Sequence, residues 1–453
     1  MGTDQPVAAQ PLSEQDLLRL LDQAASDLGF RAWIVGGYVR DKLLGRPHPN
    51  PDVVVEHGDA LALARRFAEL SGARPPVVFE RFGTAQVSLP GRLVEFVTAR
   101  AESYDPGSRK PDVRPATLEA DLRRRDFTVN TLLMDLDGHI EDRLGGRADL
   151  DARILRTPAD PIRTFSDDPL RMLRAIRFAA ELGFQLDSGL IPAMIGLRSR
   201  LAPPVISIER ITDELRRMLS SSRPKVAIDL MDQASLLDLI LPEVVACKGV
   251  PQGGYHTHDV FGHTLLTVQA TPPDLLVRVA ALFHDAGKPA TAAGDGTFVG
   301  HEEVGAAIAR AALERLRFPQ HEIDVVTGLI RLHLRPVYYG REWTDGAVRR
   351  LARDAGPLLD RLMTLARADI AASAYPHPEK LDELQARLDA VRSETPSRLE
   401  PVVSGEDVMA VMGIGPGPEV GRIKRRLQEM VLDGELPADR QAVLDHLRSH
   451  REV

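Results

Sequence analysis

The sequence predicts an α+β fold, with a small mixed sheet near the N-terminus and helices in the rest of the chain. Short β-branched runs and helices share the first third, and strand signals nearly vanish from Arg156 onward. A chain of 453 residues is also too long for one typical core. We therefore expect a head, a helical neck, a helical body and a helical tail, at residues 1–155, 156–225, 226–380 and 381–453.

The elements follow from hydrophobic periodicity and from glycine and proline breaks. In chain order we expect a helix at 14–28, a strand with a glycine turn at 32–37, a helix at 39–45, a strand at 53–55, a helix at 59–71, and strands at 77–80, 84–89, 93–98 and 129–135. Beyond Arg156, breaks between helices are expected at 203–204, 251–254, 272–273, 294–296 and 396–401.

The composition is that of a folded protein outside the membrane. Apolar residues make up 43% of the chain and charged residues 27%. No apolar run approaches the roughly 18 residues that cross a bilayer, and the first ten residues lack the pattern of a secretion signal. We expect a cytoplasmic protein with no membrane partner. Because Cys247 is the only cysteine, any metal must rest on carboxylate and imidazole ligands.

The net charge of −8 argues against a nucleic-acid binder, because phosphate contacts need Lys and Arg. The charge is uneven, however. Residues 156–225 carry 12 basic and 8 acidic side chains, a local balance of +4 that leaves −12 on the rest. A polyanion could be held at this segment, although ordinary solvated helix faces explain the same count equally well.

Two glycines and three oxygen-bearing side chains in the head suggest phosphate chemistry. In IVGGYVRD, Gly36 and Gly37 lead from a strand into a helix, where backbone N–H groups can face a phosphate. Asn50 and Asp52 are two apart, so a strand would project them from one side. Glu95 interrupts the apolar LVEFV, which is costly unless the carboxylate binds something. Carboxylates on adjacent strands can hold the Mg²⁺ ions of phosphoryl transfer, but a surface strand edge with salt bridges is the alternative.

Three further segments carry a family resemblance. These are RRDFTVNTLLMDLDG, followed by Gly145, Gly146, Asp149 and Leu150; DDPLRMLRAIRFAAELGF; and ISIERITDEL. Their order and spacing resemble the bacterial class II tRNA nucleotidyltransferases, the CCA-adding enzymes and their poly(A) polymerase relatives. The resemblance runs from Val35 to the C-terminal segment. It implies a polymerase-β-like nucleotidyltransferase head, with tRNA, CTP and ATP as partners and Mg²⁺ as cofactor.

The resemblance implies roles for individual residues. Asp52 and Glu95 would bind Mg²⁺, and Gly36 and Gly37 the triphosphate. The further candidates for nucleotide binding are Arg40, Arg124, Arg125, Asp126, Asp168, Arg171, Arg174 and Arg177.

For two groups among these candidates, the resemblance also implies which part of the nucleotide they bind. Arg124, Arg125 and Asp126, at the expected start of a strand, match residues that recognise the ribose. Asp168 and Arg171 match residues that read the edge of the incoming base. They should share one face of a helix capped by Ser166 or Asp167 and ended by Gly183, steadied by Glu209 and Arg210; a salt-bridged helix face is the alternative.

Asn50 departs from the family pattern. The family segment runs Asp-x-Asp, so Asn50 stands where the first metal-binding Asp is expected. An amide offers one neutral oxygen and no charge to a divalent ion. We therefore expect nucleotide addition to be weak or absent.

A second set of ligands lies in the helical body. It resembles the HD phosphohydrolase superfamily, whose pattern of a His, a His-Asp pair and a distant Asp is matched by His263, His284, Asp285 and Asp369, with His301 and His333 as further candidates. Such a set without cysteine suits a divalent transition metal or Mg²⁺. Some bacterial CCA-adding enzymes carry such a domain with phosphatase or 2′,3′-cyclic phosphodiesterase activity. The alternative is that these histidines only fill a core.

The tail contains a glycine-proline turn followed by a helix with Lys424, Arg425 and Arg426. This face could contact RNA backbone, as the family tail does, or simply be solvated. The leading hypothesis is thus CCA addition to tRNA. The alternatives are addition of A only, of CC only or of poly(A), and a metal-dependent phosphohydrolase with a degenerate RNA-binding head. The oligomeric state stays open.

Overall fold

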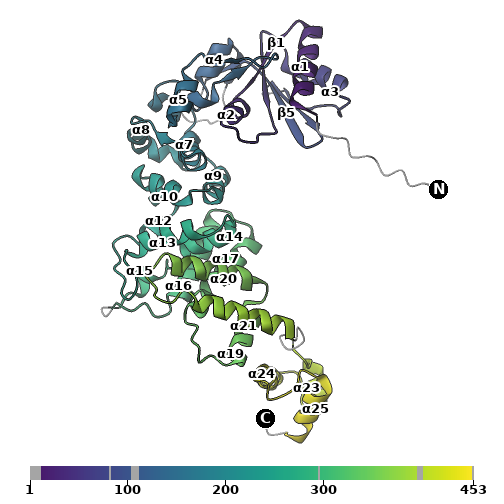
Figure 1. Cartoon of the computed structure of the whole chain (residues 1–453), viewed down its shortest axis with the longest axis vertical. Helices are drawn as coiled ribbons and strands as arrows, with labels where there is room; N and C mark the ends of the chain where they lie inside the picture. Colours follow the sequence, from purple (N-terminus) through teal and green to yellow (C-terminus); the bar gives the residue numbers. More distant parts are fainter. Residues whose placement is uncertain (1–11, 81–82, 104–111, 294–295, 395–400, 451–453) are drawn as a thin grey trace, which may run out of the picture. The chain divides into compact units, whose positions relative to one another are not determined.

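The computed structural model describes residues 12–80, 83–103, 112–293, 296–394 and 401–450. It divides into two compact units, residues 1–236 and 237–453 (Figure 1). The α+β prediction is confirmed, because the sheet lies in the N-terminal head and helices form the body. The finer division into four parts stays a prediction.

A seven-stranded mixed sheet forms the centre of the head, with the order β3-β4-β5-β2-β1-β8-β9. Its strands are β1 (Arg31–Val35), β2 (Asp52–Glu56), β3 (Val77–Phe79), β4 (Thr84–Leu89), β5 (Arg92–Thr98), β8 (Leu133–Met134) and β9 (Ile140–Glu141). Strands β2 and β5 run parallel, and the other neighbours are antiparallel. The parallel pair brings the starts of β2 and β5 to the same edge.

The two faces of the sheet have different partners. Helices α1 (Glu14–Leu28) and α3 (Ala60–Ser71) cover one face, where the rings of Phe67 and Phe96 lie 5.5 Å apart. The other face packs on α4 (Leu118–Arg123) through a buried cluster that includes Val54 and Val97. Side chains alternate along a strand, so Asp52 and Glu95 share the α4 face with these two valines.

Most elements of the head were predicted, with one error and several omissions. The strand expected at 129–135 is wrong at its start, because Thr128–Asn130 is a 3₁₀ turn and only Leu133–Met134 pairs with β1. The turn is held by Thr131, whose hydroxyl donates to the carbonyl of Thr128. The omitted elements are the pair β6 (Arg100–Ser103) and β7 (Asp112–Pro115), the short strand β9, and the helices α4 and α5 (Gly146–Ala152). Helix α2 (Gly37–Leu43) begins two residues earlier than the helix expected at 39–45.

Five helices and one short strand pair follow the head. They are α6 (Pro161–Asp167), α7 (Leu170–Leu182), α8 (Leu190–Leu197), α9 (Ile208–Ser220), α10 (Pro224–Gln233), and β10 (Ile154–Leu155) with β11 (Gln185–Leu186). The expected cap of α7 is wrong: Ser166 and Asp167 belong to α6, and the Asp168 carboxylate accepts the N–H of Leu170 at 3.1 Å. Gly183 ends α7 in the left-handed conformation, as predicted.

A buried ion pair joins α7 to α9, and we expect its loss to destabilise this unit. Arg177 and Glu214 are each 5% exposed, and the Arg177 Nε donates to the Glu214 carboxylate. Glu214→Ala leaves a buried guanidinium without its main partner, which should lower the free energy of unfolding by about 3 kcal/mol. The control is Glu181→Ala, which removes the more exposed partner of Arg177, and should cost less than about 1 kcal/mol. Equal losses in thermal unfolding of the two variants would contradict this assignment.

The second unit is helical throughout its described part. Its helices before the tail are α11 (Leu237–Ile240), α12 (Pro242–Val245), α13 (Val260–Ala270), α14 (Leu275–Phe283), α15 (Lys288–Thr291), α16 (His301–Arg315), α17 (Gln320–Leu332), α18 (Leu334–Val337), α19 (Asp345–Ala355), α20 (Leu359–Ala371) and α21 (Lys380–Glu394). The breaks expected at 251–254 and 272–273 fall between helices. Residues 294–295 and 396–400 of the other two expected breaks lie outside the described residues.

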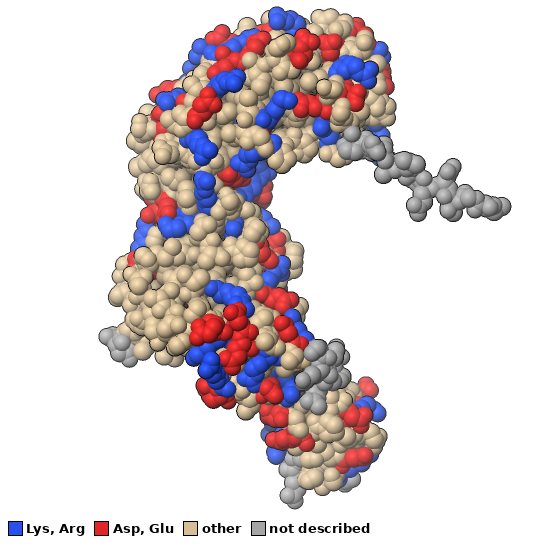
Figure 2. All heavy atoms as spheres, viewed as in Figure 1, with Lys and Arg blue, Asp and Glu red and all other residues tan. Residues whose placement is uncertain are grey.

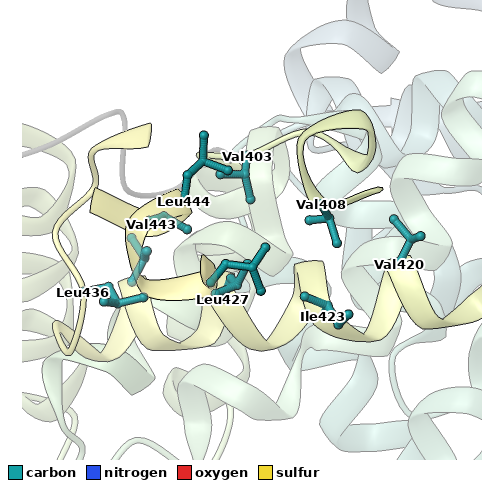
Figure 3. Close-up of a cluster of buried hydrophobic side chains, with 10 residues drawn as sticks. Val403, Val408, Val420, Ile423, Leu427, Leu436, Val443 and Leu444 are labelled. Atoms are coloured by element: carbon teal, nitrogen blue, oxygen red, sulfur yellow. The ribbon is translucent and has the colours of Figure 1, made fainter. Parts of the chain in front are cut away.

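The tail forms its own small core. Helices α23 (Gly405–Met412), α24 (Pro418–Asp433) and α25 (Arg440–Ser449) enclose ten buried apolar residues, eight of which are labelled in Figure 3. Helix α19 contacts α24 through Arg350 and Arg353, which pair with Asp433 and Glu429. Among the helices that the structure describes, none is long and apolar enough to span a membrane.

Candidate active sites

Two carboxylates face each other at the start of the parallel strand pair. Asp52 on β2 is the register partner of Glu95 on β5, and Glu95 also accepts a hydrogen bond from Gln86 at 3.3 Å. Burial raises the pKa of Asp52 to about 6, the charge of Glu95 adds to this, and Arg125 opposes it. A cation held by the two carboxylates would offset both the burial of Asp52 and its repulsion by Glu95.

Gly36 lies against Asp52 in a backbone conformation that favours glycine. Its φ is +82°, in the region that favours glycine. A Cβ at this position would lie 3.3 Å from Nη1 of Arg125 and 3.4 Å from Oδ2 of Asp52. Arg125 is held in place by the buried Asp121, at 3.1 Å. The glycine turn, the metal-type carboxylate and a guanidinium thus meet at one point.

Asn50 lies just before β2, so the expectation that a strand would align positions 50 and 52 is wrong. The strand begins at Asp52, and Asn50 is exposed. Its Oδ1 accepts the N–H of Leu93 at 2.9 Å, and the carbonyl of Pro51 accepts the N–H of Glu95 at 3.1 Å. The Asn50 side chain is nevertheless fixed beside β5 by its bond to Leu93, which precedes Glu95 by two residues.

Arg124, Arg125 and Asp126 follow the end of α4 and precede the 3₁₀ turn, which corrects their expected place at the start of a strand. Arg124 pairs with Asp121 at 2.6 Å. Asp126 is 8% exposed and accepts from Nε of Arg174 at 3.0 Å and from Asn130 at 2.9 Å. Burial alone would raise the pKa of Asp126, but the Arg174 charge and these hydrogen bonds hold it far below its usual range.

Asn130 extends this network to Arg40. Nη1 of Arg40 donates to Oδ1 of Asn130 at 2.8 Å, and its other nitrogens bind Asp41. A chain of hydrogen bonds thus runs from α2 through Asn130 and Asp126 to Arg174 on α7. The sequence reasoning missed Asn130, although it lies in the same RRDFTVN segment.

Asp168 and Arg171 lie close together but do not pair with each other through their side chains in any contact the structure records. Asp168 lies between α6 and α7, and its second oxygen is 3.4 Å from Nη2 of Arg210 on α9. Arg171 is 8% exposed and donates to the carbonyls of Thr164 and Arg124. The expectation that Asp168 shares one helix face with Arg171 is therefore wrong, because α7 begins at Leu170. The Arg210 guanidinium contacts the Asp168 carboxylate just before that helix. The guanidinium of Arg177 pairs with Glu214 and Glu181, which favours a positioning role for Arg177.

Six potential metal ligands meet in the helical body. The structure groups them as two sets of three: His263, His284 and Asp369, and Asp285, His301 and His333. Asp285 joins the sets, because its Oδ2 lies 3.3 Å from Nε2 of His284 and its Oδ1 lies 3.4 Å from Nε2 of His301. Five of the six side chains are buried, and Asp369 is nearly so. All six predicted ligands are brought together.

Three of these imidazoles are oriented in the same way. The Nδ1 atoms of His284, His301 and His333 lie 2.7, 2.8 and 2.6 Å from the backbone carbonyls of Ala281, Phe298 and Ile330, three residues earlier in each case. With Nδ1–H donating to a carbonyl, Nε2 is left as the metal-binding atom. Burial and the nearby His284 lower the pKa of His333 to about 4, which keeps its ring in the neutral form that binds metals. The donor set fits two divalent transition-metal ions.

Lys288 is a residue of this site that the sequence reasoning missed. It is 8% exposed, and its Nζ lies 2.7 Å from Oδ2 of Asp285 and 2.6 Å from Oε1 of Gln252. It follows Asp285 by three residues in HDAGK, so helical spacing could have revealed it. Burial alone would raise the pKa of Asp285, but His284 and Lys288 hold it well below the usual value.

The raised pKa of Asp52 predicts a pH-dependent cost to stability when no metal is present. The folded protein holds the Asp52 proton up to about pH 6, whereas an unfolded chain releases it near 3.8. Stability should therefore fall as pH rises from about 4 to 6 and stay lower above that. In EDTA at pH 7, Asp52→Asn should raise the free energy of unfolding by roughly 1–3 kcal/mol. The gain should vanish below pH 4, and the exposed Asp137→Asn serves as control; a destabilised Asp52→Asn at pH 7 would refute the assignment.

Known family models match three parts of the chain. They are described as Poly A polymerase head domain, at residues 32–156; probable RNA and SrmB-binding site of polymerase A, at 183–247; and HD domain, at 256–374. The head model spans Asp52 and Glu95, and the HD model spans all six ligands of the body.

Similar proteins are found along almost the whole chain. An A-adding tRNA nucleotidyltransferase of Deinococcus radiodurans is 34% identical over 91% of this chain and 94% of its own length. A CC-adding tRNA nucleotidyltransferase of Thermus thermophilus is 34% identical over 93% and 95%. Among solved structures, the Bacillus stearothermophilus CCA-adding enzyme in complex with CTP is 26% identical, with a TM-score of 0.71 over 97% of this chain and 98% of that one.

Proposed function

The chain belongs to the tRNA nucleotidyltransferase family, and from that premise we propose that it adds C and A from CTP and ATP to the 3′ end of tRNA. The observation that carries the proposal is the meeting of Asp52, Glu95, Gly36 and Arg125 at the edge of the sheet. In the reaction, the 3′ oxygen of tRNA bonds to the α-phosphorus. The bond to pyrophosphate breaks, and the hydroxyl proton passes to solvent.

Asp52 and Glu95 are the residues that would hold Mg²⁺, since hard cations prefer carboxylate oxygens. When bound, Mg²⁺ neutralises charge on the triphosphate and activates the attacking oxygen. The backbone at Gly36 and Gly37 approaches the triphosphate, and Arg125 supplies a positive charge beside it. These groups act mainly by positioning and by electrostatic stabilisation, which dominate phosphoryl transfer.

Nucleotide recognition is proposed for the network behind the carboxylates. Buried Asp126 pairs with the partly exposed Arg174, and Asn130 links this pair to Arg40. Together with Arg124, which pairs with Asp121, these groups would hold the ribose and the base side of the nucleotide. Asp168 and Arg171 would read the base edge, since one accepts and the other donates hydrogen bonds. Arg210 and the carbonyl of Arg124 fix these two side chains in place.

The proposed macromolecular partner is tRNA. The RNA-binding family match covers residues 183–247, which overlaps the segment 156–225 with its local charge of +4. Figure 2 shows basic and acidic side chains interspersed over the visible face of the first unit, so the basic side chains of that face do not form one continuous patch. A Thermotoga maritima CCA-adding enzyme complexed with tRNA shares the fold, with a TM-score of 0.59 at 20% identity. We also propose a cytoplasmic location, because these substrates are found there.

A ladder of products tests the proposal. Three tRNA substrates are used, one without its 3′ tail, one ending in C and one ending in CC, with labelled CTP, ATP or both. Addition of C, C and A in turn is expected, weakly by the chain itself and strongly by its Asn50→Asp variant. Addition of A only, of CC only or of many A residues would replace CCA addition by a narrower activity, and no addition by either the chain or its Asn50→Asp variant would refute nucleotidyl transfer.

The buried ligand set favours a second function, hydrolysis of a phosphate ester in the body. The two sets of three ligands are linked through Asp285. Burying so many polar side chains together is costly unless they bind a metal. For a 2′,3′-cyclic phosphate, water oxygen bonds to phosphorus, one ring P–O bond breaks, and the water proton ends on the released oxygen. The test measures two activities of the same protein: ring opening of 2′,3′-cyclic AMP with Mn²⁺, which reports hydrolysis in the body, and incorporation of labelled ATP with Mg²⁺, which reports nucleotidyl transfer in the head.

A further inference from the structure

The ligands of the body lie in a cavity much larger than a phosphate group. Its volume is about 1080 Å³, and both ligand sets contribute to its lining, through Asp285, His301, His333 and Asp369. A volume of this order holds a drug-sized or nucleotide-sized ligand. The groups on the remaining wall should therefore determine which phosphate ester is chosen.

Aromatic rings gather on that wall. Four of the six tyrosines of the chain line the cavity: Tyr255, Tyr338, Tyr339 and Tyr375. Tyr255 is 53% exposed and Tyr338 is 69% exposed, so much of each side chain is open to solvent. Tyr339 is instead buried, and its hydroxyl contacts Glu383. Two exposed rings are thus available to a ligand in the cavity.

Tyr255 is held in a defined position. Its ring meets that of Tyr375 edge to face, with centroids 5.3 Å apart, which leaves at least one face of each ring uncovered by the other. The carbonyl of Tyr255 accepts the N–H of Ala374 at 2.8 Å, so the segment before α13 is fixed to the end of α20. A ring fixed in this way can stack on a base with little further loss of entropy.

The charge of the cavity suits a ligand with a single phosphate. Asp285, Glu302, Glu342 and Asp369 provide four carboxylates, and Lys288 and Lys380 provide two ammonium groups. Two divalent ions would turn this deficit into an excess of about two positive charges. That excess of positive charge matches the charge of a phosphate monoester or a cyclic phosphodiester. A triphosphate or a long phosphodiester would carry several more negative charges, which the carboxylates of Glu302 and Glu342 would repel.

We propose that Tyr255 and Tyr338 bind the base of a nucleoside monophosphate or nucleoside cyclic phosphate, and so make the body site selective for nucleotides over simple phosphate esters. This inference rests on the proposed hydrolysis at that site. Base stacking tolerates any of the four bases, because every base has a π face. The expected selectivity is therefore for the presence of a base and hardly for its identity.

The experiment compares two cyclic phosphates in the full-length, Mn²⁺-loaded protein. One is 2′,3′-cyclic AMP, and the other is glycerol 1,2-cyclic phosphate, which has the same reactive ring and no base. We expect kcat/KM to favour the nucleotide by at least about tenfold. The double variant Tyr255→Ala with Tyr338→Ala should remove most of that preference through KM, since stacking is equal in ground and transition states.

Two control variants separate stacking from general damage. Tyr255→Phe retains the ring and should retain the preference. Val299→Ala shortens an aliphatic side chain that lines the same cavity and is 86% exposed, and should leave the preference unchanged. A preference near one in the unmodified protein, or the same preference after the double substitution, would overturn the inference.

A binding measurement keeps the inference distinct from the proposed hydrolysis. If neither cyclic phosphate is opened, the proposed hydrolysis fails. The inference is then decided by calorimetric titration of AMP and inorganic phosphate into the Mn²⁺-loaded protein. Tighter binding of AMP that the double variant loses would support it, and equal binding of AMP to protein and double variant would overturn it.

Discussion

Asn50→Asp is expected to raise nucleotide addition on the order of a hundredfold. The substitution introduces a negative charge two residues before Asp52 and against Leu93 of β5, at the position that matches the first metal-binding Asp of the family. An interaction that acts mainly in the transition state is worth roughly this factor when it is lost or restored. The measurement is incorporation of labelled ATP and CTP into tRNA without its 3′ tail, at several Mg²⁺ concentrations.

The structure suggests that this change is tolerated by the fold. The Asn50 side chain accepts the N–H of Leu93, and a carboxylate oxygen can accept the same bond. The control is Asn50→Ala, which removes the bond and adds no charge, and should not increase the rate. The introduced charge should also raise the pKa of Asp52 further, so the gain should be larger at pH 8 than at pH 6. Normal rates in the unmodified chain, unchanged by Asn50→Asp, would remove position 50 from the metal site.

Asp285→Asn is expected to abolish hydrolysis in the body, with a loss of about a thousandfold or more. Each carboxylate oxygen of Asp285 faces a different set of ligands, so one substitution weakens both metal sites. An amide cannot offer two equivalent anionic oxygens. The measurements are metal content after dialysis, expected to fall toward zero, and the rate of opening of 2′,3′-cyclic AMP.

Two comparisons make the Asp285→Asn result specific. Glu302→Gln removes a partly exposed carboxylate on the same wall, and should change metal content little. Nucleotide addition by the Asn50→Asp chain should survive the further Asp285→Asn substitution. Retention of two metal ions by Asp285→Asn would show that the carboxylate does not connect the two sets.

Local sequence patterns predicted most elements because hydrophobic periodicity, capping residues and glycine breaks indicated the same element bounds. Helix α1 begins and ends as expected, with Ser13 accepting the N–H of Asp16 and Gly29 in the left-handed conformation. The strand expected at 129–135 was wrong at its start because the apolar residues of TVNTLLMD can be buried equally well in a strand or in a turn. There, the hydrogen bonds of Thr131 and Asn130 decide the conformation, and no periodicity reveals them.

The site residues could be named from motifs, but their contacts required the fold. The parallel pairing of β2 and β5 sets Asp52 opposite Glu95, and it joins strands separated by more than thirty residues. Arg171 is directed by the carbonyl of Arg124, and Asp168 by Arg210 on another helix. The His284–Asp285 pair was evident from the sequence, whereas the division of the Asp285 oxygens between two sets depends on five helices meeting.

Three imidazoles of the body site each bond to a backbone carbonyl three residues earlier, so each ring is oriented independently of the other two. Each ring is oriented by the turn that carries it, and needs neither a neighbouring ligand nor a bound ion for its tautomer. Substituting one of these histidines should therefore leave the other two aimed as before. When these histidines are substituted one after another, the affinity for metal should therefore fall in steps. The surrounding helices should stay folded at each step.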